Sequence, residues 1–562
     1  MNENFFNTYE KWLASSLLTI DEKKELQSIS KNENEIRDRF LTNLEFGTAG
    51  LRGVMELGTN RMNKYVVRHA SQGLANYLNK DFKNPSVAIA YDSRNNSELF
   101  AKETASVLAA NNIKVYIFKE LMPVPALSFA TRQLKCSAGV VITASHNPKQ
   151  YNGFKVYGPD GCQITIDAAK KVLENINKLD IFDDVKYSSF EEKLMQNSII
   201  YISDDIIEKY YASVLNQSIK SAKVSPRILN ITYTPLHGAG FKPVTKILEN
   251  DGFNHVDIVE EQKLPDGNFT TCPYPNPEIK EAMNLGMQLM IKNNNDILVA
   301  TDPDSDRAGV AINQKGEAII LTGNEIGILL FDFIYHARKE ENTLPNIPVV
   351  VKSLVSSDLV NIMGKKFGVE VRDVLTGFKF IGEQILFLEQ KGEKNRFILG
   401  FEESYGYLTN TDVRDKDAVN AIILICEMAN YYKHQGITLL DRLNDLYKEF
   451  GQYKTITIPY EFIGFDAKDR MKSFMSSTRN TEFKNEIGNV IGVIDYLKQE
   501  KNINGVITST NLPSSDVIRF LLPDHETITF RPSGTEPKLK TYIFCKEENL
   551  AKIKNKIDSL IK

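Results

Sequence analysis

The chain has 562 residues, of which 25% are charged and 42% hydrophobic, and its formal net charge is −4 at pH 7. This composition is typical of soluble globular proteins, and the length predicts several domains. Proteins that bind nucleic acids or acidic membranes usually present a strongly basic surface, so we expect neither kind of partner. No apolar run approaches the roughly 20 residues of a membrane-spanning helix.

Cysteine and histidine usage argues against disulfide and zinc frameworks. The five cysteines and seven histidines are scattered, without a CxxC pair or a histidine cluster. Scattered cysteines of this kind are typical of reduced thiols in cytosolic proteins. The N-terminal sequence MNENFFNTYEKW lacks the basic and apolar segments of a secretory signal, so a cytoplasmic location is expected.

The predicted elements alternate between strand and helix over most of the chain, after about 45 residues with a helical pattern. The first segment predicts strands at 86–90, 114–118 and 138–142 and helices at 98–110 and 125–134. The second predicts strands at 228–233, 255–259 and 297–300 and helices at 243–250 and 278–292. The third predicts helices at 324–338, 357–367 and 380–389 and strands at 349–351, 370–374 and 396–399.

The pattern changes from about Gln452 to alternating, half-buried strands at 455–459, 517–522 and 527–530, followed by a helix at 549–561. The polar region 476–489 carries no clear pattern. We therefore expect three similar α/β domains with mixed sheets and a C-terminal α+β domain. The expected domain ranges are 1–207, 208–322, 323–450 and 451–562.

A serine and a histidine follow the strand predicted at 138–142, in the sequence TASHNP at residues 143–148. Ligands of α/β sheets bind at this end of the strands. Neighbouring residues in an extended segment point in opposite directions, so we do not expect His146 to take the proton of Ser145. A phosphorylated serine would need a metal and cations instead of such a base. An ordinary turn is the alternative.

The sequence TDPDSDR, residues 301–307, follows the strand predicted at 297–300. Its alternate carboxylates can converge on one hard cation such as Mg²⁺. A calcium loop would need glycine at the position of Arg307. A solvated acidic loop is the alternative, but carboxylates this close repel one another unless a cation joins them. The carboxylates belong to Asp302, Asp304 and Asp306. Arg307 would either face a phosphate or balance the negative charge of these carboxylates.

Two further clusters contain groups that suit a sugar phosphate. The sequence RPSGTEPK, residues 531–538, combines an arginine fork with hydroxyl and backbone donors, so we interpret it as a phosphate cradle. A hairpin with a polar tip is the alternative. In GFEESYG, residues 400–406, Glu402 and Ser404 could exchange hydrogen bonds with sugar hydroxyls, or the segment could be an acidic turn.

In chain order, the motifs at residues 143–148, 302–307, 400–406 and 531–537 together resemble the α-D-phosphohexomutase superfamily across nearly the whole chain. Within it, the chain is similar to the phosphoglucomutase/phosphomannomutase group, which includes phosphopentomutase-like members. The resemblance implies four domains around a central cleft. It also implies that Ser145 carries the phosphoryl group and that an oxygen of phosphorylated Ser145 joins the aspartate trio in holding one Mg²⁺ per chain.

The resemblance implies roles for further residues. Arg52, His146 and Lys155 match catalytic positions near the transferring group, and Lys155 is the candidate general acid and base. The implied substrate-binding residues are Thr376, Gly377, Lys379, Glu402, Ser404, Arg414, Lys416, Arg531, Ser533, Gly534 and Thr535.

The implied reaction interconverts a sugar 1-phosphate and a sugar 6-phosphate, with glucose favoured, through phosphoserine and a sugar 1,6-bisphosphate that serves as intermediate and activator. Phosphomannomutase and phosphopentomutase activities are the alternatives within the class. A serine-dependent phosphatase or hydrolase and a non-catalytic sugar-phosphate-binding protein are the alternatives outside it. The expected partners are small sugar phosphates, and the expected assembly is a monomer or dimer.

Overall fold

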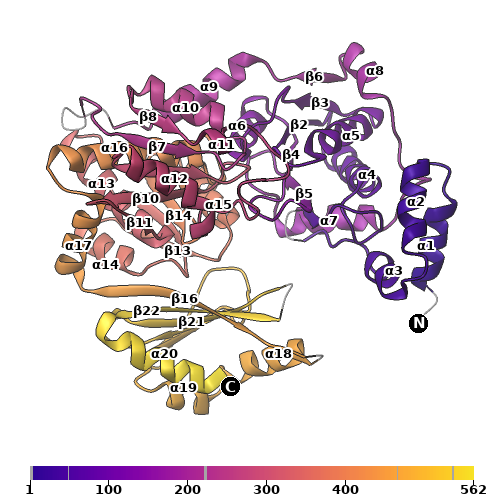
Figure 1. Ribbon diagram of the computed structural model, residues 1–562. Helices are drawn as coiled ribbons and strands as arrows, with labels where there is room; N and C mark the ends of the chain where they lie inside the picture. Colours follow the sequence, from indigo (N-terminus) through magenta and orange to yellow (C-terminus); the bar gives the residue numbers. More distant parts are fainter. Residues whose placement is uncertain (1–3, 48–49, 220–224, 465, 535–536, 562) are drawn as a thin grey trace. The chain divides into compact units, whose positions relative to one another are not determined.

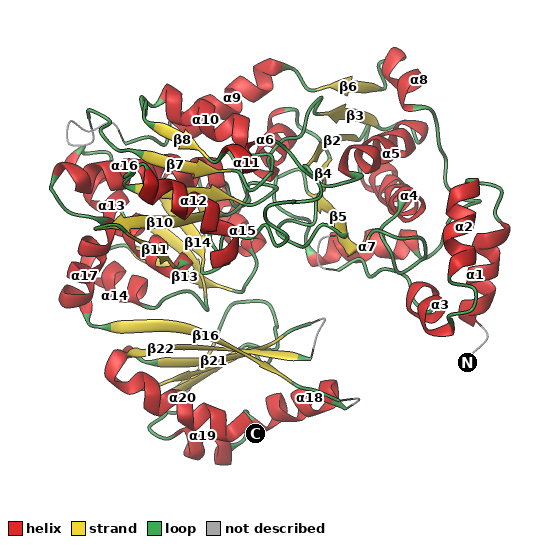
Figure 2. Ribbon diagram, in the orientation of Figure 1, coloured by secondary structure: helices red, strands yellow, loops and turns green. Residues whose placement is uncertain are grey.

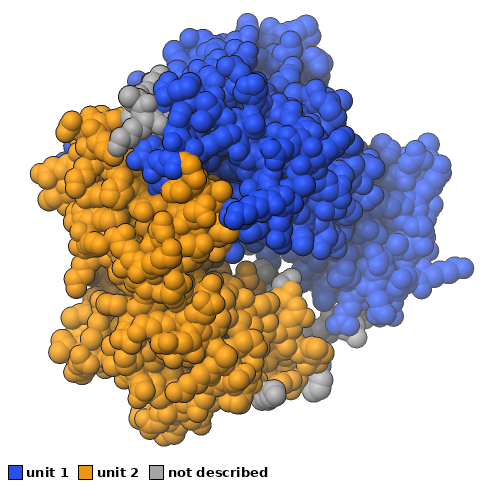
Figure 3. Space-filling view, turned by 60° about the vertical axis from the view of Figure 1, so that its left-hand side comes forward, with its two compact units in different colours: residues 1–322, 382–394, 405–435 blue, residues 323–381, 395–404, 436–562 orange. Residues whose placement is uncertain are grey.

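The computed structural model describes residues 4–47, 50–219, 225–464, 466–534 and 537–561 (Figure 1). The chain divides into two compact units, which Figure 3 colours separately. Unit 1 comprises residues 1–322, 382–394 and 405–435, and unit 2 comprises residues 323–381, 395–404 and 436–562.

The N-terminal helices of unit 1 pack against the rest of its first domain through an aromatic cluster. Trp12 is fully buried and makes edge-to-face contacts with Phe40, Tyr65 and Phe182. Such contacts add to the apolar area that each ring buries. The predicted helical start is therefore confirmed, and its helices are α1 (Asn4–Ala14), α2 (Ile20–Ser28) and α3 (Glu33–Phe40).

The first sheet has six strands in the order β1-β5-β4-β2-β3-β6 (Figure 2). Strands β4, β2, β3 and β6 are parallel, and β5 pairs antiparallel with both β4 and β1. The strands are β1 (Gly50–Val54), β2 (Ser86–Tyr91), β3 (Lys114–Ile117), β4 (Ala138–Ile142), β5 (Tyr151–Tyr157) and β6 (Ile199–Tyr201). The helices are α4 (Lys64–Asp81), α5 (Ser97–Ala110), α6 (Val124–Gln133), α7 (Ile166–Ile176), α8 (Phe190–Met195) and α9 (Asp204–Leu215).

The second sheet of unit 1 has the order β11-β10-β9-β7-β8. Every residue of β9 is buried because α12 and α16 both pack against this strand, as expected for a strand covered on both faces. The strands are β7 (Ile231–Thr234), β8 (Val256–Ile258), β9 (Ile297–Thr301), β10 (Ala308–Gln314) and β11 (Glu317–Leu321). The remaining elements are α10 (Phe241–Asn250), α11 (Glu260–Lys263), α12 (Lys280–Lys292), β15 (Gly406–Leu408) and α16 (Ala418–His434).

Unit 2 begins with a parallel arrangement in which β12 lies between β13 and β14. Helix α13 packs against β14, and α14 packs against β13. The strands are β12 (Val349–Ser353), β13 (Glu370–Val374) and β14 (Phe397–Glu402). The helices are α13 (Gly323–Glu340), α14 (Leu359–Phe367) and α17 (Leu439–Phe450), and α15 (Phe378–Gln390) contributes residues to both units.

The C-terminal part of unit 2 is an antiparallel sheet in the order β16-β22-β21-β20-β17-β18-β19. Helices α18 and α20 pack on it, over a core that includes Phe520, Phe530 and Ile543. The strands are β16 (Tyr453–Glu461), β17 (Gly492–Asp495), β18 (Glu500–Ile503), β19 (Val506–Ser509), β20 (Ile518–Leu521), β21 (Thr527–Pro532) and β22 (Lys538–Lys546). The helices are α18 (Ala467–Ser477), α19 (Thr481–Ile487) and α20 (Glu547–Ile561).

The fold class agrees with the sequence analysis, namely three α/β domains with mixed sheets and an α+β domain. One boundary differs where it matters for the site. The helix expected from Glu278 begins at Lys280, because the backbone N–H of Glu278 donates to the side chain of Asn276 in a turn. Within the described part of the chain, no helix is long and apolar enough to cross a membrane.

Candidate active site

Two strand ends in unit 1 bring the serine and the aspartates together. Ser145 lies just beyond β4, and the aspartate loop lies just beyond β9. The hydroxyl of Ser145 is 3.0 Å from Oδ2 of Asp302. One carboxylate oxygen from each of three buried residues lies within 4.8 Å of the others, and these residues are Asp302, Asp304 and Asp306.

The serine loop is a turn with a left-handed residue at its centre. Ser145 has φ 52°, a region that side chains other than glycine adopt only when their surroundings enforce it. The turn places Nδ1 of His146 at 3.2 Å from Oγ of Ser145. The expectation that His146 points away from Ser145 is therefore wrong, because it assumed an extended segment. Burial, followed by the nearby Arg307 and Arg52, lowers the pKa of His146 to about 2, so this ring is neutral.

A close backbone approach holds the serine loop against the neighbouring hairpin. The N–H of Thr143 donates to the carbonyl of Gly153 on β5. A Cβ atom at Gly153 would lie 2.5 Å from the carbonyl oxygen of Thr143, so only glycine fits here. The same strand carries Lys155 two residues later, which aims its amine at the aspartates.

Burial and mutual repulsion perturb the pKa values of the three carboxylates. Burial and the adjacent Asp304 and Asp306 raise the pKa of Asp302 well above its usual range. Burial also raises the pKa of Asp306, with repulsion from Asp304 adding to the effect. Burial alone would raise the pKa of Asp304, but attraction to Lys155 outweighs it and the pKa is lowered.

The arrangement fits a divalent metal ion. Among the described residues, Oδ1 of Asp304 and Oδ1 of Asp306 are buried without a hydrogen-bond partner. Buried carboxylate oxygens normally have such partners, and a hard cation accepts this type of ligand. The donor set therefore suits Mg²⁺, in agreement with the sequence analysis.

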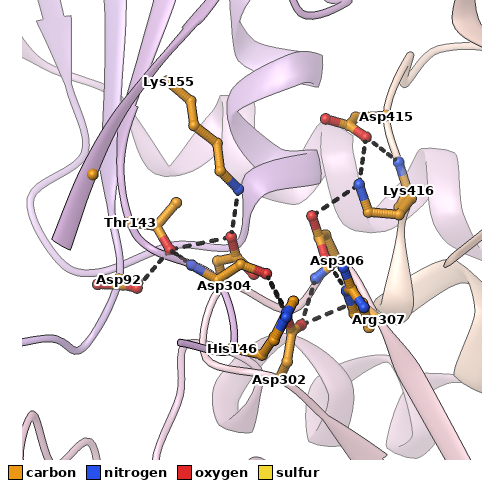
Figure 4. A network of polar contacts seen from close by, with 12 residues as sticks. Asp92, Thr143, His146, Lys155, Asp302, Asp304, Asp306, Arg307, Asp415 and Lys416 are labelled. Atoms are coloured by element: carbon orange, nitrogen blue, oxygen red, sulfur yellow. Dashed lines mark hydrogen bonds and ion pairs between the residues drawn. The ribbon is translucent and has the colours of Figure 1, made fainter. Parts of the chain in front are cut away.

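Three cationic side chains surround the aspartates (Figure 4). The amine of Lys155 lies 3.0 Å from Asp304, and the amine of Lys416 lies 3.1 Å from Asp306. Arg307 instead forms an ion pair of 2.6 Å with Glu278, while its backbone N–H donates to Asp302. Cations on several sides of one point suit a group that carries several negative charges.

Several supporting residues were not recognised in the sequence. The hydroxyl of Thr143 lies 2.6 Å from Asp92 and 3.1 Å from Asp304, and it accepts the backbone N–H of Ser145. Asp415 accepts a hydrogen bond of 2.7 Å from Tyr157. It also contacts the amine of Lys416 at 3.1 Å, as Figure 4 shows for these two labelled residues. Asp92 begins the sequence DSR, residues 92–94, shortly after the predicted strand 86–90. This position at a strand end was a usable sign that Asp92 belongs to the site.

Two arginines assigned by resemblance differ in their surroundings. Arg52 lies on β1, is exposed, and donates to the side chain of Asn147 in the serine loop. Arg414 is fully buried and pairs with Glu389 at 2.6 Å. The guanidinium is thus already paired with a carboxylate, and its expected contact with the sugar phosphate stays a prediction.

Lys416, another expected substrate residue, lies in unit 1 beside Asp306 at 3.1 Å, whereas the remaining described ones lie in unit 2. Oε1 of Glu402 accepts the backbone N–H of Gly377 at 2.7 Å, so these two predicted segments adjoin. Thr376 has a buried hydroxyl, the amine of Lys379 lies over the Phe380 ring, and Ser404 is half-buried beyond β14.

The predicted phosphate cradle is the tip of the β21–β22 hairpin. Arg531 donates to the hydroxyl of Tyr542 at 3.4 Å, and the N–H of Ser533 donates to the carbonyl of Lys538. Gly534 is exposed, and Thr535 lies outside the described residues. The described residues of this segment thus belong to a hairpin, which was the alternative interpretation. A hairpin tip can still bind phosphate, so the role as a phosphate cradle stays a prediction.

Comparison with known proteins identifies the family. Models described as phosphoglucomutase/phosphomannomutase, alpha/beta/alpha domains I, II and III, match residues 43–181, 208–316 and 322–450. A phosphoglucomutase of Staphylococcus aureus (strain bovine RF122 / ET3-1) is 36% identical over 537 residues, which cover 94% of each chain. The chain belongs to the phosphoglucomutase/phosphomannomutase family.

Other relatives of this family agree. A phosphoglucomutase of Staphylococcus haemolyticus (strain JCSC1435) is 37% identical over 527 residues, covering 93% of this chain and 94% of that protein. The open form of the Paramecium phosphoglucomutase pp63/parafusin covers 92% of this chain and 96% of its own, with a TM-score of 0.68 and 17% identity, and so shows the shared fold. The predicted family, fold class and mutase type of enzyme are therefore confirmed.

Proposed function

We propose that this family member interconverts a sugar 1-phosphate and a sugar 6-phosphate, with glucose as the favoured sugar, through a phosphoserine at Ser145. One observation carries the proposal: Oγ of Ser145 lies 3.0 Å from Asp302, within a group of three buried carboxylates bordered by cationic side chains. The names of the staphylococcal relatives support glucose as the sugar.

The metal site supports the same chemistry. Asp302, Asp304 and Asp306 would hold Mg²⁺ together with an oxygen of phosphorylated Ser145. A divalent ion bound there would neutralise charge on the phosphoryl group during transfer. The protein residues supply the remaining electrostatic stabilisation and the alignment, which dominate catalysis of phosphoryl transfer.

In the proposed transfer, one bond to phosphorus breaks for each bond that forms, and the site supplies the group that carries the proton. The bond between phosphorus and Oγ of Ser145 breaks as a sugar hydroxyl bonds to phosphorus. We infer that Lys155, as the neutral amine, receives the proton of that hydroxyl and, as the resulting ammonium, returns it to the sugar oxygen that leaves in the second half-reaction. The resulting 1,6-bisphosphate then donates its other phosphoryl group back to Ser145. Water must be excluded meanwhile, since it would hydrolyse the phosphoserine.

We infer that residues of unit 2 bind the rest of the substrate. Glu402 and Ser404 would contact sugar hydroxyls, Thr376, Gly377 and Lys379 would orient the ring, and the segment 531–535 would hold the non-reacting phosphate. Their residue types support this, because arginine and backbone donors suit phosphate and carboxylates suit hydroxyls. We also infer domains at 1–207, 208–322, 323–450 and 451–562, a cytoplasmic location and a monomer or dimer.

The test is a coupled assay with the 1-phosphates of glucose, mannose and ribose, in Mg²⁺ with a trace of the matching bisphosphate. We expect glucose 1-phosphate to give the highest kcat/KM and Ser145→Ala to abolish turnover. Ser71→Ala is a matched control, because the Ser71 hydroxyl only bonds the Val67 carbonyl inside α4. A higher kcat/KM with mannose or ribose would change the sugar assignment, and release of inorganic phosphate without isomerisation would indicate a phosphatase.

A further inference from the structure

One arginine outside the predicted site holds the whole serine loop. Arg94 follows β2, whose end at Tyr91 pairs in register with Ile142 at the end of β4. One terminal nitrogen of its guanidinium donates to the carbonyls of Ser145 and Asn147, and the other to those of Pro148 and Tyr151. A single side chain therefore binds four carbonyls of the segment 145–151.

The arginine is itself fixed by a buried carboxylate. Nε of Arg94 lies 3.2 Å from Oδ2 of Asp92, and both side chains are fully buried. Asp92 also accepts hydrogen bonds from Ser97 at 2.7 Å and Thr143 at 2.6 Å. A buried ion pair adds little stability, because desolvation offsets the attraction, but the hydrogen bonds that Asp92 and the terminal nitrogens of Arg94 make restrict the geometry of the residues around them.

The same guanidinium also faces the domain that carries the aspartates. It lies 5.0 Å from the ring of Phe269, which is fully buried and has φ 47°. Cations bind such ring faces favourably. Beside it, the amide of Asn95 donates to Asn268 at 3.1 Å. Arg94 thus contacts both the serine loop and the segment 268–269 that precedes α12.

The position of Arg94 bears on how Ser145 is held close to the aspartates, which the proposed reaction requires. Ser145 and the aspartates belong to different sheets, and the 3.0 Å approach of Ser145 to Asp302 depends on how the serine turn is set. The carbonyl of Ser145 is one of the four acceptors, so Arg94 restricts the peptide that follows the left-handed residue. Misplacement of a reacting group by about 1 Å can lower a rate about a hundredfold.

We propose that Arg94 is a positioning residue that fixes the Ser145 loop against the aspartate-bearing domain, with Asp92 and Phe269 as its supports. Its catalytic consequence rests on the mutase function proposed above. Its structural consequence, a rigid segment 143–151, does not depend on that function.

The experiment compares Arg94→Lys with Arg227→Lys. Arg227 is a matched control: its guanidinium is buried, pairs with Asp251 at 2.5 Å and Glu427 at 2.6 Å, and lies 5.0 Å from the Phe253 ring. Lysine keeps the charge of Arg94 but cannot reach four carbonyls. We expect Arg94→Lys to lower kcat about a hundredfold with KM nearly unchanged, and Arg227→Lys to leave both close to wild type.

Hydrogen–deuterium exchange of peptides that cover residues 143–151 is the second readout. We expect about tenfold faster exchange in Arg94→Lys and wild-type exchange in Arg227→Lys, because only the first variant frees the loop. Unchanged kcat and exchange in folded Arg94→Lys would overturn the inference, as would equal losses in the two variants.

If Arg94→Lys does not fold, Phe269→Leu decides. This variant removes the ring face while it keeps an apolar side chain, and the inference requires about three- to tenfold lower kcat and faster exchange of 143–151; wild-type values would overturn it. A wild-type protein without mutase activity would refute the proposed function alone, since the exchange data would still show whether Arg94 fixes the loop.

Discussion

Replacing Asp302 by asparagine should stabilise the protein when divalent ions are absent. Asp302 accepts two backbone N–H groups and the Ser145 hydroxyl, whereas the amines of Lys155 and Lys416 lie against Asp304 and Asp306. Two carboxylate charges no more than 4.8 Å apart repel by at least about 3 kcal/mol at an effective dielectric constant near 20. Lost attraction to nearby cations offsets part of this, so we expect a net gain of about 1–3 kcal/mol.

The assay is thermal unfolding of Asp302→Asn and wild type in EDTA and in Mg²⁺. In EDTA the variant should melt a few degrees higher. Mg²⁺ at a hundred times its Kd should stabilise the wild type by about 2.7 kcal/mol and the variant by less, so the advantage of the variant over the wild type should shrink. Asp296→Asn is a control with the same charge change, because its carboxylate pairs with Lys433 at 2.7 Å; it should be less stable in both buffers. A lower melting temperature for Asp302→Asn in EDTA would refute the reasoning.

Three further predictions concern single side chains. Lys155→Gln should lower kcat at least about a hundredfold with little change in KM, since its amine lies 3.0 Å from Asp304 at the transfer point; a wild-type kcat would exclude the proton-transfer role. Arg531→Gln should raise KM for the sugar phosphate about tenfold or more, measured by initial rates, and an unchanged KM would remove the phosphate cradle. Burial raises the pKa of Asp417 to about 7, well above the usual range of an aspartate, although the backbone N–H of Asn420 and the hydroxyl of Tyr210 donate to it. A carboxyl whose pKa is higher in the folded than in the unfolded state lowers the stability of the protein as pH rises from about 4 through 7. Asp417→Asn should therefore melt at a higher temperature than wild type at pH 8, with a smaller difference at pH 5. Equal differences at both pH values would contradict this.

The local patterns predicted the elements well where hydrophobic periodicity was strong. The helices at 98–110 and 125–134 and the strand at 138–142 appear as α5, α6 and β4 within one residue at each end. Strand β5 was missed because it follows a serine turn and glycine interrupts it. Its assignment depends on pairing with β4 and β1, which a single sequence does not reveal.

The site was predicted through its motifs, whereas its geometry was not. Ser145 and Asp302 are far apart in the chain, and their contact follows from the packing of two sheets. The orientation of His146 depended on the left-handed Ser145, which no periodicity signals. Arg414 sits in a motif rich in charges, but its partner Glu389 on α15 decides which way it points. Arg94 went unrecognised because its acceptors are backbone carbonyls, which carry no sequence signature.

The transfer of phosphate from Ser145 to sugar is the central claim, and single-turnover label transfer tests it most directly. Protein carrying ³²P on Ser145 would be mixed with unlabelled glucose 1-phosphate in Mg²⁺, and the products separated within one turnover. The account predicts label in glucose 1,6-bisphosphate and then in glucose 6-phosphate. Label that appears only in inorganic phosphate, or that stays on the protein, would contradict it.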